Sequence, residues 1–195
     1  MIKIIGTHHL MKKEEIEQII REFNPDIIGV ELCETRINSL INPVEHTDDS
    51  MLGKIVKGLN DKSKKENLTY GSDMVTASKY ALDNKIKLVP LDLDVRIIQF
   101  MFQIIPDNEK NGFLEELKIL ETTEEKLEGN INNSNTDDYL KNFSEKYPIT
   151  FMLTVKYRDL FIAFNLMKLI NENKDKRIII FLGKGHMKEV SNLCK

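Results

Sequence analysis

The last apolar run of the chain, Ile178-Ile179-Ile180-Phe181, narrows the possible folds more than any other feature of the sequence. A strand that is apolar on both faces is typical of the buried centre of a parallel sheet, because helices cover both sides of such a sheet. Three more short apolar runs precede it. The four predicted strands span Ile2–Ile5, Ile27–Leu32, Ile86–Leu91 and Arg177–Leu182. We therefore expect an α/β fold with a mainly parallel central sheet flanked by helices.

Helical patterns separate these runs. Lys12–Phe23 repeats its apolar residues at helical spacing and carries acidic residues near its start, where the helix dipole favours anions. Ser72 is a suitable N-cap for a second helix, from Asp73 to about Asp83. Each helix lies between two predicted strands, and this order is typical of βαβ units.

The rest of the sequence is mostly helical in character. Helices are predicted over Asp94–Ile105, Asn108–Glu128 and Pro148 to about Asn173, with a polar loop over Asn130–Asp138. The segment Asn42–Lys65 predicts a loop with a short helix that could act as a lid. We expect a single α/β domain over residues 1–195, with a largely helical insertion at about residues 94–173 before the last strand.

Composition excludes several kinds of partner. The formal net charge is -3 and the isoelectric point is about 5.9, so the chain has no general attraction for nucleic acid. No uninterrupted apolar stretch approaches the ~20 residues needed to cross a bilayer, and the amino terminus lacks the apolar region of a signal peptide. We expect a cytoplasmic protein with no membrane span, in which Cys33 and Cys194 are free thiols.

Two similar motifs follow the first and last predicted strands. They are Gly6-Thr7-His8-His9 and Gly183-Lys184-Gly185-His186, each a Gly-x-x-His. We expect the glycine to allow a sharp turn and the histidine to lie at the carboxyl end of its strand. Glu31 ends the second predicted strand, and Asp92 and Asp94 follow the third. Because parallel strands end at one edge of a sheet, these polar residues are predicted to share that edge.

Two histidines and a carboxylate are a common set of ligands for a catalytic divalent metal. His9, His186 and Glu31 are therefore candidate ligands of manganese, cobalt or zinc. Such an ion lowers the pKa of bound water to ~7, which yields hydroxide at neutral pH. The sequence equally allows Glu31 to act as a general base, with Arg158 as its electrostatic partner or as the group that steadies a developing oxyanion.

The chain resembles the TraB family, which includes the pheromone-shutdown proteins and is similar to the Tiki metalloproteases and to the erythromycin-esterase and ChaN-like fold. Five segments carry the resemblance, in the order of the family. They are Gly6-Thr7-His8-His9, Pro25-Asp26 with Val30-Glu31-Leu32-Cys33-x-x-Arg36, Asp92-Leu93-Asp94, Tyr157-Arg158-Asp159 and Gly183-Lys184-Gly185-His186. The resemblance implies a site formed by the two motif histidines and the glutamate. For the Tiki branch, it also implies metal-dependent peptide hydrolysis.

This sequence departs from the family pattern at two positions. Leu93 and Tyr157 stand where the family usually has an arginine and a glutamate. If these two charges compensate each other in the family, the site survives their joint loss; if they contact substrate, specificity or activity changes. The membrane-spanning tail of many bacterial members is also absent from this sequence.

Other residues have both a functional and a structural interpretation. The predicted substrate-binding residues are Arg36, Asp92, Asp94 and Asp159, beside the catalytic candidates Glu31, Arg158, His9 and His186. Asp94 also fits the N-cap of the following helix. Glu31 could instead form a structural ion pair with Arg36 or Arg158, and each histidine alone could be a buried hydrogen-bonding group.

Our leading hypothesis is a metal-dependent hydrolase that cleaves a peptide or another amide or ester bond of a small substrate. The alternative is a non-catalytic binding protein that sequesters a small peptide signal in the same crevice. A third hypothesis is a family member kept only for partner contacts, and it predicts a homodimer formed through the helical region.

Overall fold

The computed structural model describes residues 1–7, 11–41, 71–122 and 136–194. These residues form two compact units. Unit 1 contains the described residues up to 41, residues 71–95 and the chain from Arg158 onward; unit 2 contains residues 96–122 and 136–157. The predicted lid segment, Asn42–Lys65, lies outside the described residues. No helix in the described part of the chain has both the length and the apolar character that a bilayer crossing requires.

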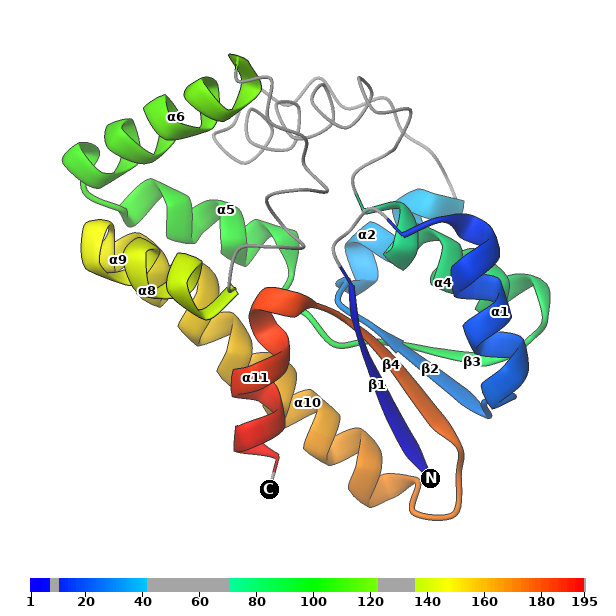
Figure 1. The fold of residues 1–195 in the computed structure, drawn as a ribbon. Coiled ribbons are helices and arrows are strands. Elements are labelled where there is room, and N and C mark those ends of the chain that lie inside the picture. The colour runs from blue at the N-terminus through cyan, green and yellow to red at the C-terminus, as the bar shows by residue number, and fades with distance from the viewer. Residues whose placement is uncertain (8–10, 42–70, 123–135, 195) are drawn as a thin grey trace. The chain divides into compact units, whose positions relative to one another are not determined.

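Unit 1 is built on a parallel four-stranded sheet (Figure 1). Its strands are β1 (Ile2–Thr7), β2 (Ile27–Val30), β3 (Lys87–Pro90) and β4 (Ile178–Gly183). Their order across the sheet is β1-β4-β2-β3, and all three pairings are parallel. The last strand therefore lies between the first two, which places β4 beside β1 although about 170 residues separate them in sequence. The predicted α/β class with a mainly parallel sheet is confirmed.

Helices cover both faces of this sheet (Figure 1). They are α1 (Lys13–Phe23), α2 (Glu34–Ile41), α4 (Ser72–Asp83), α10 (Tyr157–Glu172) and α11 (Lys184–Leu193). Ile179 and Phe181 of β4 join a core cluster with residues of α1 and α4. The intervening residues Ile178 and Ile180 join a second cluster with residues of α10 and α11. All six residues of β4 are buried, as predicted for a central strand that packs against helices on both faces.

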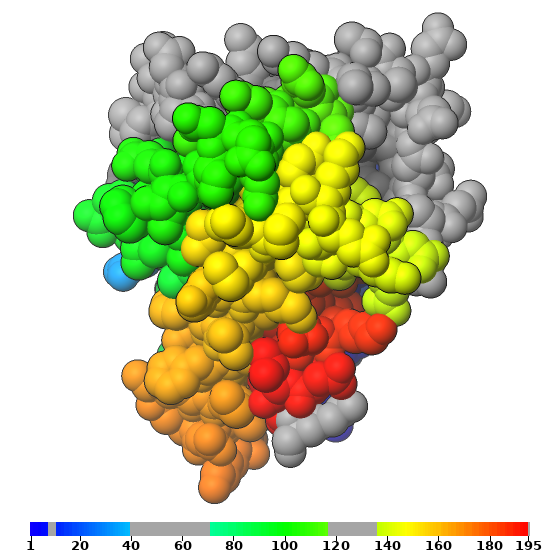
Figure 2. Space-filling model, turned by 90° about the vertical axis from the view of Figure 1, so that its left-hand side faces the viewer, coloured from blue at the N-terminus to red at the C-terminus, as the bar shows by residue number. Residues whose placement is uncertain are grey.

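Figure 2 shows α10 and α11 next to each other on one face of unit 1. They share the apolar cluster that contains Ile162, Leu166 and Val190, none of which is exposed. Burial of side chains of this size contributes about 1.5–3 kcal/mol each. The two helices that carry the functional candidates of the second half of the chain are therefore fixed by the core of unit 1.

Two local predictions in unit 1 are wrong. Ser72 does not cap α4: the N-cap is Gly71, which has a φ of 78°, and the Ser72 hydroxyl donates to the carbonyl oxygen of Met11 at 3.3 Å. Glycine tolerates this left-handed conformation because it has no Cβ. The second strand ends at Val30 rather than Leu32, so Glu31 follows the strand instead of lying inside it.

Unit 2 is helical where it is described. Its helices are α5 (Val95–Ile104), α6 (Asp107–Thr122), α8 (Thr136–Lys146), α9 (Pro148–Phe151) and the π-helix η1 (Met152–Lys156). Phe143 is the centre of an aromatic cluster, with ring centroids 5.4 Å from Phe113 and 5.7 Å from Phe151. The polar loop predicted over Asn130–Asp138 is wrong at its end, because α8 begins at Thr136.

The long helix predicted from Pro148 to about Asn173 is present, because the chain is helical without a break over Pro148–Glu172. What the sequence did not predict is the π-helical segment η1, which lies between α9 and α10 within this run. The backbone N–H of Tyr157 donates to the carbonyl oxygen of Met152, five residues earlier, which is the hydrogen bond of a π-helix. The Thr154 hydroxyl also donates to the carbonyl oxygen of Thr150 at 2.7 Å, a local bond of the kind that bends helices. Arg158 follows η1 by two residues, in the first turn of α10 and within this helical run.

Candidate functional site at the carboxyl edge of the sheet

Five polar side chains of unit 1 gather where the strands end. Glu31 follows β2 directly, Asp92 comes two residues after β3, and His186 comes three residues after the end of β4. Arg158 and Asp159 come from the first turn of α10. We refer to these five residues as the edge cluster. In parallel α/β sheets, the crevice outside the carboxyl ends of the strands is the usual place for a ligand.

Arg158 joins two carboxylates of the edge cluster. Its Nε and Nη2 atoms donate to the two oxygens of Asp92, at 3.0 and 2.8 Å, and Nη2 also donates to Glu31 Oε1 at 2.7 Å. The two-pronged contact with Asp92 matches the planar fork of a guanidinium to a carboxylate. Burial lowers the pKa of Arg158, but the charges of Asp92 and Glu31 outweigh this effect and raise its pKa above the ordinary value. Arg158 is therefore a permanent cation.

Both carboxylates are also held by the backbone. The N–H of Leu93 donates to Asp92 Oδ1 at 2.8 Å, and the N–H of Gly183 donates to Glu31 Oε2 at 2.6 Å. The side chains of Asp92 and Glu31 are 0% and 4% exposed. These backbone hydrogen bonds add to the contacts that both carboxylates make with Arg158. The contribution of Gly183 to the candidate site is therefore its backbone N–H, which holds Glu31.

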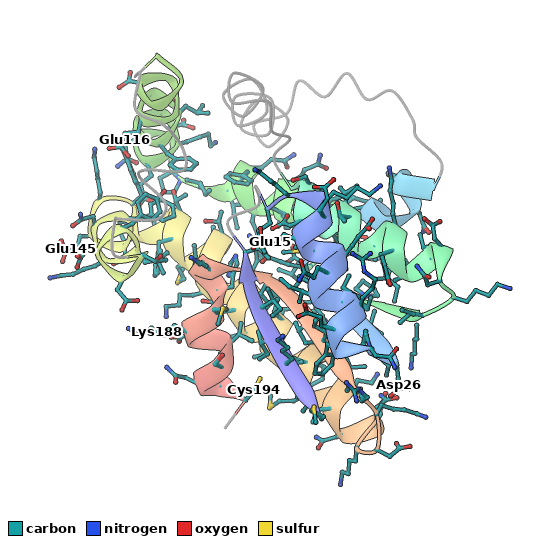
Figure 3. The ribbon with its side chains drawn as sticks, turned by 45° about the vertical axis from the view of Figure 1, so that its right-hand side comes forward. Glu15, Asp26, Glu116, Glu145, Lys188 and Cys194 are labelled. Atoms are coloured by element: carbon teal, nitrogen blue, oxygen red, sulfur yellow. The ribbon has the colours of Figure 1, made fainter. Side chains whose placement is uncertain are left out.

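His186 lies between two carboxylates. Its Nδ1 atom is 2.6 Å from Asp159 Oδ1, and its Nε2 atom is 3.3 Å from Glu31 Oε1. Asp159 is 2% exposed at its side chain and His186 is 10% exposed. Lys188, two residues further along α11, points away from the sheet instead (Figure 3). The imidazole is therefore on the inner face of α11, with a carboxylate at each ring nitrogen.

The edge cluster carries an excess of negative charge. Three carboxylates contribute −3 and one guanidinium contributes +1, so the formal charge of the five side chains is −2 with a neutral imidazole and −1 with a protonated one. Buried charge without compensation costs several kcal/mol per ion, even after relaxation of the protein. An additional cation near these carboxylates would lower that cost.

Two of the three predicted metal ligands are neighbours. Glu31 Oε1 and His186 Nε2 are 3.3 Å apart, and two ligand atoms that each lie ~2.0–2.2 Å from a tetrahedral zinc are separated by about that distance. The third predicted ligand, His9, lies outside the described residues. The described residues hold no group of three or more histidine, cysteine, aspartate or glutamate side chains arranged to bind a metal ion. The donor pair fits a divalent ion, and the metal itself remains a prediction.

The other predicted substrate-binding residues lie in different surroundings. Arg36 is on the exposed side of α2, and the sequence had left open whether Glu31 pairs with it or with Arg158; the structure pairs Glu31 with Arg158. Asp94 is half-buried, and its Oδ2 accepts a hydrogen bond from the Thr35 hydroxyl at 3.1 Å. Asp94 thus connects the start of α2 to the segment that follows β3.

Only one of the two motif glycines lies where the chain turns. Gly6 lies within β1, and a Cβ at this position would be 2.1 Å from Met187 Sδ. Its function is therefore to let α11 approach β1 closely. Gly183 is the junction between β4 and α11, so the chain turns there as expected. Its φ of −59° and ψ of 138° are open to other residues as well.

Sequence reasoning missed two buried polar residues near this edge. Asp73, in the first turn of α4, is 0% exposed, and its Oδ1 accepts the N–H of Met74 at 2.8 Å. Thr7 is also buried, and its hydroxyl donates to the carbonyl oxygen of Leu182 at 3.3 Å, which ties β1 to β4. An aspartate at a helix start is usually an exposed first-turn residue, so its sequence gave no signal of burial.

The comparisons with known proteins do not indicate an activity. No known protein-family model matches the chain. The chain is 30% identical, over 224 aligned positions, to an uncharacterized protein of Methanocaldococcus jannaschii. The alignment covers 100% of this chain and 53% of that protein, so the chain spans about half the length of the relative it matches.

Proposed function

We propose that the protein is a metal-dependent hydrolase of the TraB and Tiki type, which cleaves a peptide or another amide or ester bond. The observation that supports this most is the pair formed by Glu31 Oε1 and His186 Nε2, 3.3 Å apart among buried carboxylates. This pair lies at the carboxyl edge of a parallel sheet, and the five side chains of the edge cluster together carry a formal negative charge. Both features favour a divalent cation.

His186 and Glu31 would hold the ion, together with His9 as the sequence predicts. Manganese, cobalt and zinc all accept imidazole and carboxylate ligands. When bound, such an ion supplies Lewis acidity and lowers the pKa of a water molecule. Leu93 and Tyr157, which replace the charged residues of the family, stand beside Asp92 and Arg158 in sequence. The contact between Asp92 and Arg158 is present without those charges.

The protein's own residues divide the remaining tasks. Glu31 Oε1 is the atom that would bind the ion or take a proton from the attacking water, because it lies 3.3 Å from His186 Nε2, whereas Oε2 is turned to the N–H of Gly183. Oε1 also accepts a hydrogen bond from Arg158, which orients it. Arg158 directs its Nε and Nη2 atoms at Asp92 and Glu31. This supports a role for Arg158 in orienting Glu31 over a role in receiving an oxyanion.

The test combines metal analysis with a cleavage assay. Protein purified without chelators is analysed for transition metals, then incubated with a peptide mixture and manganese, cobalt or zinc, and products are identified by mass spectrometry. We expect metal-dependent cleavage that is lost in His186→Ala, His9→Ala and Glu31→Gln. Lys188→Ala, on the outer side of α11, should keep full activity.

The same experiment distinguishes the alternative. A protein that only sequesters a peptide would retain it intact, and mass spectrometry would show the bound peptide at its original mass. Equal cleavage by the wild type, His186→Ala and Glu31→Gln would contradict the proposed site. We place the proposed activity in the cytoplasm, as the sequence predicts.

A further inference from the structure

We infer that Asp159 is a positioning residue that fixes the tautomer and orientation of His186. The inference about the geometry stands by itself, and its meaning for metal binding rests on the proposed function. Asp159 was predicted from the sequence to bind substrate. Its side chain is 2% exposed and in contact with His186, so it offers almost no surface to a substrate.

The short contact determines where the ring proton lies. An ionised carboxylate can only accept hydrogen bonds, so the 2.6 Å contact between Asp159 Oδ1 and His186 Nδ1 requires a proton on Nδ1. In a neutral imidazole with a proton on Nδ1, the Nε2 atom carries the free lone pair. That lone pair is the one that binds a metal ion, and a carboxylate behind the ring is a frequent support of metal-binding histidines.

The second ring nitrogen of His186, Nε2, faces Glu31. Nε2 is 3.3 Å from Glu31 Oε1, which is also an acceptor. Two lone pairs at this distance repel each other unless a positive atom lies near both. Arg158 Nη2, 2.7 Å from Oε1, supplies positive charge on the side of Glu31. With the Nδ1 proton held by Asp159, a second proton on the ring or a cation shared with Glu31 would supply it at Nε2. Asp159 thereby makes His186 a preformed half of a cation site.

The core of unit 1 holds Asp159 in place. Asp159 is in the first turn of α10, and Ile162 and Leu166 of the same helix are 0% exposed in the apolar cluster. His186 is in the first turns of α11, where Val190 belongs to the same cluster. Both partners therefore come from helices that the core fixes.

The test uses the full chain labelled with ¹⁵N-histidine. Long-range ¹H–¹⁵N spectra report which ring nitrogen carries the proton, and His186→Gln identifies the signal of His186. In the wild type we expect a proton on Nδ1 of His186. Asp159→Asn and Asp159→Ala should shift the proton toward Nε2 or produce a mixture. Asp26→Asn is the matched control, because Asp26 accepts the N–H of Arg177 at 2.7 Å at the opposite end of the strands.

A second measurement relates the tautomer to the ion. Titration calorimetry with zinc or manganese alone should show binding that is ~10–100-fold weaker in Asp159→Asn than in the wild type and in Asp26→Asn. A wild-type His186 protonated only on Nε2 would overturn the inference, as would unchanged spectra in both Asp159 variants. The wild-type spectrum decides the question even if neither variant folds. A proton on Nδ1 together with no metal binding in the wild type would remove the proposed function and leave the positioning role standing.

Discussion

Two buried glutamates, one in each unit, differ in what surrounds them. Glu31 and Glu109 are 5% and 7% exposed, and each accepts hydrogen bonds from the backbone. Glu109 accepts the N–H groups of Ile149 and Thr150, at 3.2 and 2.8 Å, and the Thr150 hydroxyl at 2.9 Å. These three donors are neutral and belong to the first turn of α9. Glu109 therefore satisfies the start of a helix inside unit 2.

Glu31 has partners of another kind. Besides the N–H of Gly183, it contacts the guanidinium of Arg158 and the imidazole of His186. A single oxygen, Oε1, lies within 3.3 Å of both side chains. The two glutamates are therefore equally buried but differ in role. Glu109 accepts hydrogen bonds from the free N–H groups at the start of a helix, whereas Glu31, between a guanidinium and an imidazole, is a candidate catalytic or metal-binding residue.

The largest effect should come from removing the cation of the edge cluster. Arg158→Met keeps most of the length of the side chain but leaves Asp92 and Glu31 buried without their guanidinium. Loss of one partner of a buried ion pair costs about 3–5 kcal/mol, and the free energy of unfolding in urea should fall by that amount. No such loss is expected at Glu109 in unit 2, because the groups that donate hydrogen bonds to it are neutral.

Arg177→Met is the matched control for this change. Arg177 is exposed, donates to the carbonyl oxygen of Phe23 and lies 5.1 Å from the Phe23 ring centroid. Its replacement should cost about 1 kcal/mol or less, in the range of exposed cation contacts. Similar losses for both arginines would show that the ionic partners of Glu31 do not distinguish it from Glu109.

The next effect compares the two glutamates directly. Glu31→Gln and Glu109→Gln should each lower the free energy of unfolding by about 1–3 kcal/mol, because each replaces a buried acceptor of several hydrogen bonds. Only Glu31→Gln should weaken zinc or manganese binding, by ~10-fold or more, in titration calorimetry. Comparable loss of metal binding in Glu109→Gln would mean that the effect arises from general destabilisation.

The sequence predicted much of the sheet and part of the site, because both depend on local patterns. Short β-branched runs between amphipathic segments indicate strands of an α/β fold. Residues that follow such runs, like Glu31, Asp92 and His186, must lie at one edge once the strands are parallel. The order β1-β4-β2-β3 was not predictable, since the preference for right-handed crossovers limits the hand of a connection and leaves strand order open.

Pairings between distant residues were beyond local patterns. Asp159 and His186 are 27 residues apart, and their contact depends on how α10 and α11 pack on the sheet. The role of Glu109 was missed for the same reason, as 40 residues separate it from Ile149. The π-helix before Tyr157 also escaped prediction, because it is set by a single i to i−5 hydrogen bond rather than by a residue type that the sequence displays.

A smaller effect should isolate the helix-completing role of Glu109. Thr150→Val removes the hydroxyl that donates to Glu109 Oε2 and keeps the shape of the side chain, which is 0% exposed. We expect a loss of about 1.5 kcal/mol in the free energy of unfolding, as for one buried hydrogen bond to a charged group. Metal binding at the edge cluster should be unchanged by calorimetry. A change in metal affinity would contradict the division of roles between the two glutamates.

The smallest change in stability should come from the packing of α11 against β1. Helix α11 carries His186, the imidazole that lies beside Glu31. Gly6→Ala places a Cβ 2.1 Å from Met187 Sδ, so the flexible methionine must move. We expect a loss of about 1 kcal/mol, as for mild overpacking, together with altered His186 signals in the ¹⁵N spectra. Gly185→Ala is the matched change in α11: its Cβ meets nothing within 4 Å, so the higher helix propensity of alanine should add about 0.5–1 kcal/mol. Opposite signs for the two glycines would show that α11 is held against β1 at Gly6, whereas equal stability of both variants would mean that the close approach of Met187 does not position His186.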